Sequence, residues 1–166
     1  MSVTTRRPLA GSATVQTTSA EQTRAFAEAL AAVAQPGDRI ALLGPLGAGK
    51  TQFAKGFAGG LGVRDVVNSP SFTLMAEYSG RLPLFHQDLY RLNGAEEVLA
   101  GGLVDDRQET GVTLIDWGER LPERIDPRRL TIRFALSDGD VRNIAVDAQQ
   151  PAYSRYIRVA SAWSGQ

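Results

Sequence analysis

Residues 44–51 constrain this chain more than any other stretch. They read G-P-L-G-A-G-K-T, fit the pattern G-x-x-x-x-G-K-[ST], and lie between a predicted buried strand at 39–43 and a helical segment that begins at Lys50. Glycines let backbone N–H groups turn toward an anion, and the amino terminus of a helix adds unpaired N–H groups and a partial positive charge. The pattern therefore predicts a strand, a phosphate-binding loop and a helix.

Two side chains of this segment have predicted tasks. Lys50 brings a full positive charge to the outer phosphates of a nucleotide, and Thr51 offers its hydroxyl to Mg²⁺. The alternative is a glycine-rich turn that only packs a strand on a helix. The predicted nucleotide-binding residues are Gly44, Pro45, Leu46, Gly47, Ala48, Gly49, Lys50 and Thr51.

Composition narrows the remaining classes of function. The chain has no cysteine and one histidine, which excludes disulfides, thiol chemistry and a multi-histidine metal site. Its formal net charge is zero, so no global field draws it to nucleic acid or to a membrane surface. No apolar run reaches the roughly 18 residues of a membrane span, and the amino terminus lacks the apolar core of a signal peptide. We therefore expect a cytoplasmic protein.

The length of the chain predicts a single domain. At 166 residues the chain is long enough to bury a sizeable core, so we expect one P-loop domain over residues 1–166. Residues 1–12 are polar, and residues 151–166 carry only scattered aromatic side chains. We expect these two ends to be peripheral or partly disordered.

Strand and helix patterns alternate through the middle of the chain. Period-two and apolar runs predict strands at 13–17, 39–43, 72–78, 82–90, 112–116, 130–136 and 141–146. Helical spacing predicts helices from 19 to about 34, from 50 to about 58, and at 95–100. We expect an α/β three-layer fold of the P-loop NTPase type, with a mostly parallel central sheet, helices on both faces and antiparallel edge strands.

Asp116 is the predicted second anchor for a metal ion. It follows the apolar run 112–115, which is typical of the strand that ends beside a phosphate-binding loop. Mg²⁺ prefers oxygen ligands and keeps several waters, so one carboxylate, the Thr51 hydroxyl and phosphate oxygens suffice to hold it. The alternative is an aspartate that caps the turn at Trp117.

A second cluster of polar residues begins at His86. If the strand persists, His86, Asp88 and Tyr90 share one face of it. Asp88 is a candidate for positioning an attacking water, and Arg91 for pairing with phosphate or an acidic residue. Considered without its neighbours, His86 is more often a structural histidine.

Two further features remain open at this stage. Ser69 and Ser71 follow the predicted first helix after the loop, where many P-loop proteins carry a phosphate-sensing segment; the alternative is a polar turn that starts a strand. Trp117 either shields the site or packs in the core.

Taken together these segments resemble the TsaE (YjeE) family of small bacterial P-loop ATPases. The resemblance covers about residues 19–136. It is carried by residues 44–51, 68–74, 77–78, 86–92 and 114–117, and the patterns S-P-[ST]-[FY]-T-L and H-x-D-L-Y-R-L are more specific to the family than the phosphate loop.

The resemblance implies ATP binding and slow hydrolysis with Mg²⁺. It also implies a partner, a TsaB–TsaD complex, which makes N6-threonylcarbamoyladenosine beside the anticodon of tRNAs that read codons beginning with A. In the family the ATPase does not perform the carbamoyl transfer; its hydrolysis is thought to reset the partner complex. The zero net charge fits a protein that meets tRNA only through its partners.

Residue roles follow from the same resemblance. Lys50 is implied to bind phosphate, Thr51 and Asp116 to hold Mg²⁺, and Asp88 to assist hydrolysis, so the implied catalytic residues are Lys50, Asp88 and Asp116. Glu21 lies where the family's amino-terminal segment approaches the nucleotide.

The chain departs from the family pattern at two positions. The family usually has glutamate where this chain has Asp116, which is one methylene shorter and would reach Mg²⁺ less directly. It often has threonine where this chain has Ser71, and the hydroxyl is retained.

Two other nucleotide-binding classes compete with this interpretation. A small-molecule kinase on the same fold needs an acceptor pocket and usually an arginine-bearing lid, for which the chain offers Arg107, Arg120, Arg124, Arg128 and Arg129. A guanine-nucleotide switch expects an [NT]-K-x-D motif, and no such motif exists because the only lysines are Lys50 and Lys55.

Overall fold

The computed structural model describes residues 11–68, 70, 74–92, 106–121 and 126–165. Its strands are β1 (Gly11–Thr17), β2 (Arg39–Leu43), β3 (Met75–Tyr78), β4 (Leu84–Asp88), β5 (Val112–Asp116), β6 (Leu130–Leu136) and β7 (Arg142–Ala148). Its α-helices are α1 (Ala20–Ala31), α2 (Lys50–Gly60) and α4 (Ser154–Ala162). Short 3₁₀ helices are η1 (Asp106–Thr110), η2 (Gly118–Arg120) and η3 (Pro151–Tyr153).

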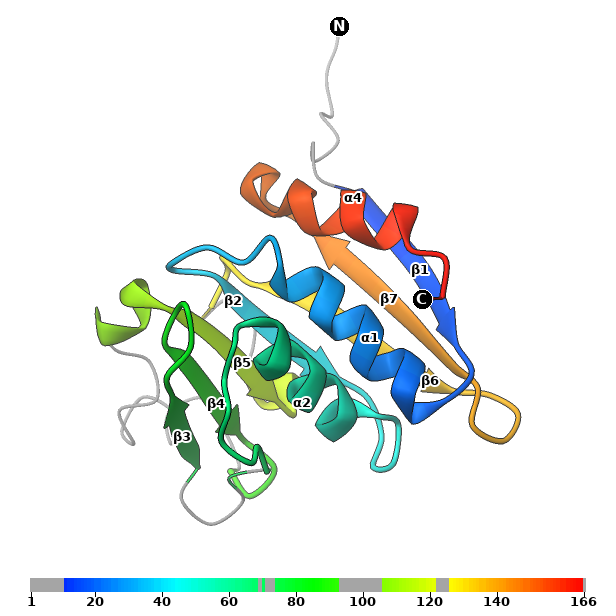
Figure 1. Ribbon diagram of the computed structural model, residues 1–166, viewed down its shortest axis with the longest axis horizontal. Coiled ribbons are helices and arrows are strands. Elements are labelled where there is room, and N and C mark those ends of the chain that lie inside the picture. Colours follow the sequence, from blue (N-terminus) through cyan, green and yellow to red (C-terminus); the bar gives the residue numbers. More distant parts are fainter. Residues whose placement is uncertain (1–10, 69, 71–73, 93–105, 122–125, 166) are drawn as a thin grey trace, which may run out of the picture.

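All seven strands form one sheet in the order β1-β7-β6-β2-β5-β4-β3 (Figure 1). The central strands β6, β2, β5 and β4 run parallel to one another. The outer pairs, β1 with β7, β7 with β6, and β3 with β4, are antiparallel. The predicted α/β fold with a parallel centre and antiparallel edges is therefore confirmed.

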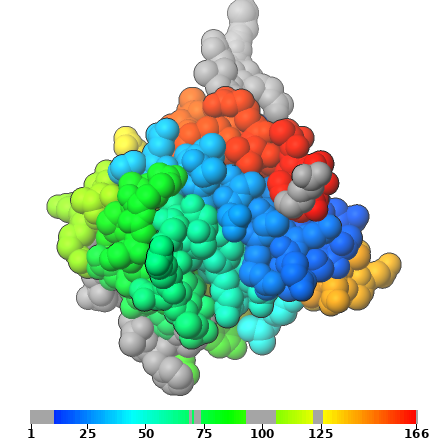
Figure 2. Space-filling model, in the orientation of Figure 1, coloured from blue at the N-terminus to red at the C-terminus, as the bar shows by residue number. Residues whose placement is uncertain are grey.

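Helices α1, α2 and α4 pack side by side over one face of the sheet, and Figure 2 shows them as a continuous layer. The large core lies beneath this layer. Phe53 of α2 is at its centre, with ring centroids 6.4 Å from Phe26, 6.1 Å from Phe57 and 5.6 Å from Phe134. Because these residues are almost completely buried, the spacing of aromatic residues in the two helices is explained by this core.

The opposite face of the sheet carries a smaller core. Leu89, Leu92, Ile115 and Leu121 are buried in it. The 3₁₀ helix η2 packs on this face, since a Cβ added to Gly118 would meet Ala41 at 2.8 Å. Helical segments thus contact the sheet on both sides.

Helices α1 and α2 approach each other very closely because two glycines of α2 face α1. A Cβ at Gly56 would lie 2.2 Å from the carbonyl oxygen of Arg24, and one at Gly60 would lie 2.7 Å from the Cβ of Ala31. Gly59 and Gly60 are the last two residues of the helix. Their small size serves packing as well as termination.

Side chains cap the start of α1. Ser19 is the N-cap, and its hydroxyl accepts a hydrogen bond of 3.0 Å from the Gln22 N–H. The Gln22 side chain does not return to Ser19. It accepts a hydrogen bond of 2.8 Å from the Thr18 N–H instead, so the two side chains together span one residue more than in a standard capping box.

The second strand of the β3–β4 hairpin is shorter than predicted. It ends at Asp88 because the Asp88 carboxylate accepts a hydrogen bond of 2.9 Å from the N–H of Tyr90, which turns the chain. Tyr90 therefore does not share the strand face of His86 and Asp88, and that prediction was wrong. The helix predicted at 95–100 and the start of the strand predicted at 72–78 lie outside the described residues.

The carboxyl-terminal segment joins the fold through α4. Tyr153 and Tyr156 are buried against the sheet. The Tyr153 hydroxyl accepts from the Arg39 N–H at 3.0 Å and donates to the Arg128 carbonyl at 2.8 Å. These two aromatic residues fix the segment to the sheet.

Among the described residues, none of the helices has both the length and the apolar character that a membrane span requires.

Candidate functional site

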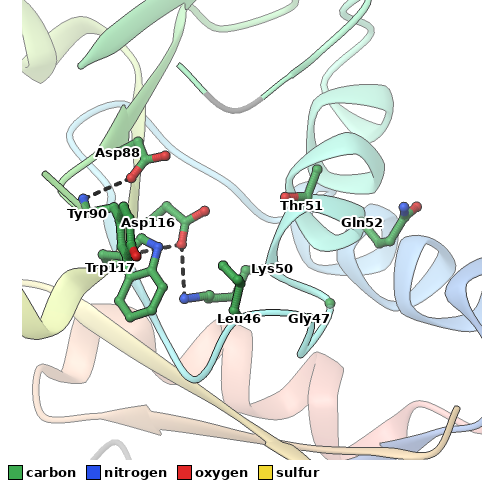
Figure 3. Close-up of a pocket in the computed structure, with 10 residues that line it drawn as sticks. Leu46, Gly47, Lys50, Thr51, Gln52, Asp88, Tyr90, Asp116 and Trp117 are labelled. Atoms are coloured by element: carbon green, nitrogen blue, oxygen red, sulfur yellow. Dashed lines mark hydrogen bonds and ion pairs between the residues drawn. The ribbon is translucent and has the colours of Figure 1, made fainter. Parts of the chain in front are cut away.

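A cavity of about 480 Å³ lies at the carboxyl ends of the parallel strands, the edge where open α/β sheets bind ligands (Figure 3). Strands β2, β4 and β5 all end beside it. The residues that line it are Leu46, Gly47, Gly49, Lys50, Thr51, Gln52, Asp88, Tyr90, Asp116 and Trp117. The structure thus brings the predicted loop and the two predicted aspartates to one cavity.

The loop between β2 and α2 has the backbone that the motif predicts. Gly44 has φ 147°, and a Cβ there would lie 2.7 Å from the carbonyl oxygen of Phe134 on the neighbouring strand. Gly49 has φ 104° and is the N-cap of α2, with no side-chain cap. An unblocked helix amino terminus therefore borders the cavity, as anion binding requires.

Lys50 is almost completely buried and its ammonium contacts three different groups. Its Nζ donates a hydrogen bond of 2.6 Å to the Gly44 carbonyl oxygen. It also lies 3.3 Å from Oδ1 of Asp116 and 3.6 Å from the centre of the Trp117 ring. Among the described residues that line the cavity, Lys50 is the only cation, and a carbonyl, a carboxylate and an aromatic face hold it beside the loop.

Asp88 and Asp116 are directly paired neighbours on the parallel strands β4 and β5. Burial raises the pKa of Asp116 above its ordinary value, and the nearby Asp88 raises it further, whereas Lys50 acts in the opposite direction. Two buried carboxyl groups are thus held side by side. A carboxyl group in a cleft whose pKa is shifted by burial and by neighbouring charges is typical of functional sites.

Trp117 forms a wall of the cavity. Its backbone is in the left-handed region with φ 57°, and its N–H donates a hydrogen bond of 2.8 Å to Oδ1 of Asp116. Its ring lies 4.9 Å from the ring of Tyr90 and also packs against the smaller core. Both interpretations of Trp117 are therefore partly correct.

Comparison with known proteins identifies the family. A family model described as threonylcarbamoyl adenosine biosynthesis protein TsaE matches residues 17–144. The chain belongs to the TsaE family.

Relatives in this family match most of the chain. The tRNA threonylcarbamoyladenosine biosynthesis protein TsaE of Bacillus subtilis is 44% identical over 134 residues, which are 80% of this chain and 84% of the relative. The protein of the same name from Treponema pallidum is 40% identical over 77% of this chain and 95% of its own. The crystal structure of Bacillus subtilis YdiB superposes with a TM-score of 0.71 and 38% identity, and covers 90% of this chain and 94% of that one.

The donors in the cavity of this TsaE-family chain suit a hard divalent cation. The Thr51 hydroxyl and the Asp116 carboxylate both border it, and oxygen is the ligand atom that Mg²⁺ prefers. The contacts of Asp116 with Lys50 and with the Trp117 N–H fall on Oδ1, and Oδ2 accepts no hydrogen bond from the described residues. Those residues contain no group of three or more His, Cys, Asp or Glu side chains that could hold a metal ion.

His86 lies on the face of β4 that carries Asp88 but does not line the cavity. It is 1% exposed, and neither ring nitrogen has a hydrogen-bond partner among the described residues. Burial lowers the pKa of His86 to about 4, although Asp88 opposes the shift. A neutral structural histidine, the more common situation, fits these observations better than a catalytic one.

The remaining sequence candidates divide into two groups. Ser69 and Ser71 lie outside the described residues. Glu21, in the first turn of α1, and Arg91 are exposed, and neither lines the cavity.

The structure adds residues that the sequence interpretation missed. The Glu119 carboxylate accepts a hydrogen bond of 3.0 Å from the Gly44 N–H, and an Arg142 guanidinium donates to the Gly47 carbonyl at 3.1 Å. Gln52 lines the cavity and is hydrogen bonded to Arg24. Glu119 and Gln52 lie close to recognised motifs and could have been suspected from position, whereas Arg142 has no local signal.

Proposed function

We propose that this chain is the ATP-binding and slowly ATP-hydrolysing subunit of threonylcarbamoyladenosine synthesis on tRNAs that read codons beginning with A. It acts with a TsaB–TsaD complex and does not perform the carbamoyl transfer itself. The observation that carries the proposal is the convergence of Lys50, Thr51 and Asp116, from a helix and a neighbouring strand, on one cavity beside a helix amino terminus.

Lys50 is the phosphate-binding side chain in this proposal. The Gly44 carbonyl and the Trp117 ring are weaker partners than an anion, so these two contacts can be exchanged for contacts with phosphate oxygens. The loop N–H groups and the amino terminus of α2 bind the remaining phosphate charge.

Mg²⁺, when bound, would neutralise charge on the phosphate oxygens, and Thr51 and Asp116 are the residues that would hold it. Lys50 competes for the same carboxylate, since its Nζ lies 3.3 Å from Oδ1 of Asp116. Movement of Lys50 toward phosphate would therefore leave that carboxylate available to the metal.

Asp88 is the residue proposed to orient the attacking water. Its Oδ1 is fixed by the Tyr90 N–H at 2.9 Å, and its strand lies directly beside that of Asp116. A carboxylate fixed at one oxygen can accept a hydrogen bond from water in a defined direction.

Exposed apolar side chains at the mouth of the cavity support a protein partner. Leu46, in the phosphate loop, is 75% exposed, and Tyr90 is 50% exposed. Large apolar residues that flank a functional site on two different loops are typical of a surface that another protein covers. With zero net charge, the chain would meet tRNA only through that partner.

Several arginines that a kinase lid would require already have partners within the fold. Arg107 pairs with Glu77 at 3.1 Å, and Arg120 donates to the Leu92 carbonyl at 2.5 Å. Arg129 is buried and donates to the carbonyl of Gly118. These contacts favour the ATPase over a small-molecule kinase.

The proposal is tested by titrating labelled ATP with Mg²⁺ into the wild type, Lys50→Ala and Lys55→Ala. Lys55 is the only other lysine and lies on the same helix but away from the cavity. Loss of charge-assisted contacts should weaken ATP binding by Lys50→Ala roughly ten- to a hundredfold, with no change for Lys55→Ala. Equal affinity in all three proteins would reject the phosphate-binding role.

The proposed partnership needs its own experiment. The chain should co-purify with TsaB and TsaD when a non-hydrolysable ATP analogue is present, and the complex should stimulate phosphate release from ATP. If no complex forms at any nucleotide concentration, the proposed partnership with TsaB and TsaD is wrong, and the chain would be an ATPase that acts without them.

A further inference from the structure

Arg142 connects the β6–β7 hairpin to the phosphate loop, 95 residues earlier in the chain. Its Nη1 donates hydrogen bonds of 2.9 Å to the carbonyl oxygens of Gly139 and Val141, inside the hairpin turn. Its Nη2 donates to the Gly47 carbonyl at 3.1 Å. The planar guanidinium is thus oriented by its own hairpin before it reaches the loop.

This contact fixes one end of a particular peptide unit. The other end of the Gly47–Ala48 peptide is also held, because the Ala48 N–H donates a hydrogen bond of 3.2 Å to the Pro45 carbonyl. A peptide plane whose C=O and N–H are both engaged cannot flip without breaking a bond. The loop tip therefore has a defined direction for its carbonyls, which must point away from a bound anion.

Close packing does not provide this restraint. A second cavity of about 110 Å³ lies on this side of the loop, between the first turn of α1 and the hairpin. Gly47, Gly49 and Arg142 border it. Because side chains leave a gap here, packing restrains the loop less. The charge-assisted hydrogen bond from Arg142 to the Gly47 carbonyl therefore contributes more to holding the loop backbone in place.

We propose that Arg142 is a positioning residue that holds the Gly47–Ala48 peptide in its anion-binding conformation before the nucleotide arrives. The inference rests on the proposed nucleotide-binding function. In this role Arg142 does not touch the nucleotide; it lowers the ordering cost of the loop, so every ligand that uses the loop benefits equally.

The test compares Arg142→Gln with Arg133→Gln. Arg133 belongs to the same hairpin, but its guanidinium lies 3.7 Å from Asp147 and is exposed. In the protein without nucleotide, hydrogen exchange of the Ala48 amide should accelerate about tenfold in Arg142→Gln and remain unchanged in Arg133→Gln. Binding of pyrophosphate, ADP and a non-hydrolysable ATP analogue should weaken by the same factor, also about tenfold.

Unequal losses would overturn the proposal. Weaker binding of the ATP analogue alone would mean that Arg142 contacts the terminal phosphate, and weaker ADP and ATP binding with unchanged pyrophosphate binding would mean that it contacts the nucleoside. Unchanged Ala48 exchange would also overturn it. If Arg142→Gln does not fold, Arg142→Lys, which keeps the charge on a single donor nitrogen, should show equal but smaller losses for the three ligands.

Failure of the proposed function is distinguishable from failure of this inference. If the wild type binds none of the three ligands, the function is wrong, while the exchange of the Ala48 amide still decides whether Arg142 orders the loop.

Discussion

The two ends of strand β2 hold buried charges in opposite ways. At its amino end, Asp38 and Arg39 each face an opposite charge: the Nε–H of Arg39 is shared between the two carboxylate oxygens of Asp126, at 2.9 Å from each, and Asp38 binds Arg155. At its carboxyl end, a single Lys50 lies beside two neighbouring aspartates. The difference separates charges that hold the fold together from charges that are available to a ligand.

The hydrogen bonds around each end support this distinction. Asp38 also accepts from the Gln35 N–H at 2.9 Å and from the Tyr156 hydroxyl, so helix α4 and the turn before β2 close around it. Lys50 instead divides its contacts among a carbonyl, a carboxylate and an aromatic ring. A buried charge with ideal partners is costly to disturb, whereas one with exchangeable partners can change them.

The largest effect is expected at the amino end of the strand. Asp126→Ala leaves Arg39 buried without its carboxylate, so the free energy of unfolding should fall by about 3–5 kcal/mol in urea denaturation. The matched control is Asp147→Ala, which breaks the more exposed pair with Arg133 and should cost less than about 1 kcal/mol. Equal losses in the two variants, or weaker ATP binding by Asp126→Ala, would contradict the comparison.

His86 provides a second, pH-dependent test, since it lies on β4 between the core and the site. The pKa of His86 in the folded protein, about 4, is below the ordinary 6.5. Between these two pH values the His86 ring stays neutral in the folded protein, whereas in the unfolded chain it gains a proton. The free energy of unfolding should therefore fall by about 3 kcal/mol as the pH drops from 6.5 to 4.

Because His86 is the only histidine, its proton NMR resonance gives the pKa directly. His86→Gln should lose less stability over the same pH range than the wild type, since carboxylates alone then titrate. A measured pKa near 6.5, or identical pH dependence in the two proteins, would mean that the histidine is solvated or paired.

The smallest effect is expected at the carboxyl end, and it has the opposite sign. The raised pKa of Asp116 means that the fold disfavours its charged form. Asp116→Asn should therefore raise the free energy of unfolding at pH 7, by about 0.5–2 kcal/mol, while it abolishes Mg²⁺-dependent ATP hydrolysis. A loss of stability similar to that of Asp126→Ala would show that both ends of the strand are structural.

Local signals made most of the fold predictable. The phosphate loop, the strand that ends at Asp116 and the two hairpins were predicted because each depends on residues within about ten positions of one another. The persistence of the strand to Tyr90 was wrongly predicted because the Asp88 side chain bonds the Tyr90 N–H and ends the strand.

Contacts between distant segments account for what the sequence did not reveal. Arg142 reaches Gly47, and Arg155 reaches Asp38, across 95 and 117 positions. No periodicity or spacing in a single sequence relates such pairs. The family resemblance implied that Asp88 and Asp116 act at one site, and the structure pairs them at the ends of the parallel strands β4 and β5, which finish at the same edge of the sheet.

The most direct measurement of the central claim is a crystal structure of the wild type grown with Mg²⁺ and a non-hydrolysable ATP analogue. The account predicts that Lys50 Nζ leaves the Gly44 carbonyl for the outer phosphates, while the contacts of Arg39 with Asp126 do not change. A Lys50 that stays on the Gly44 carbonyl, with the phosphates bound elsewhere, would contradict it.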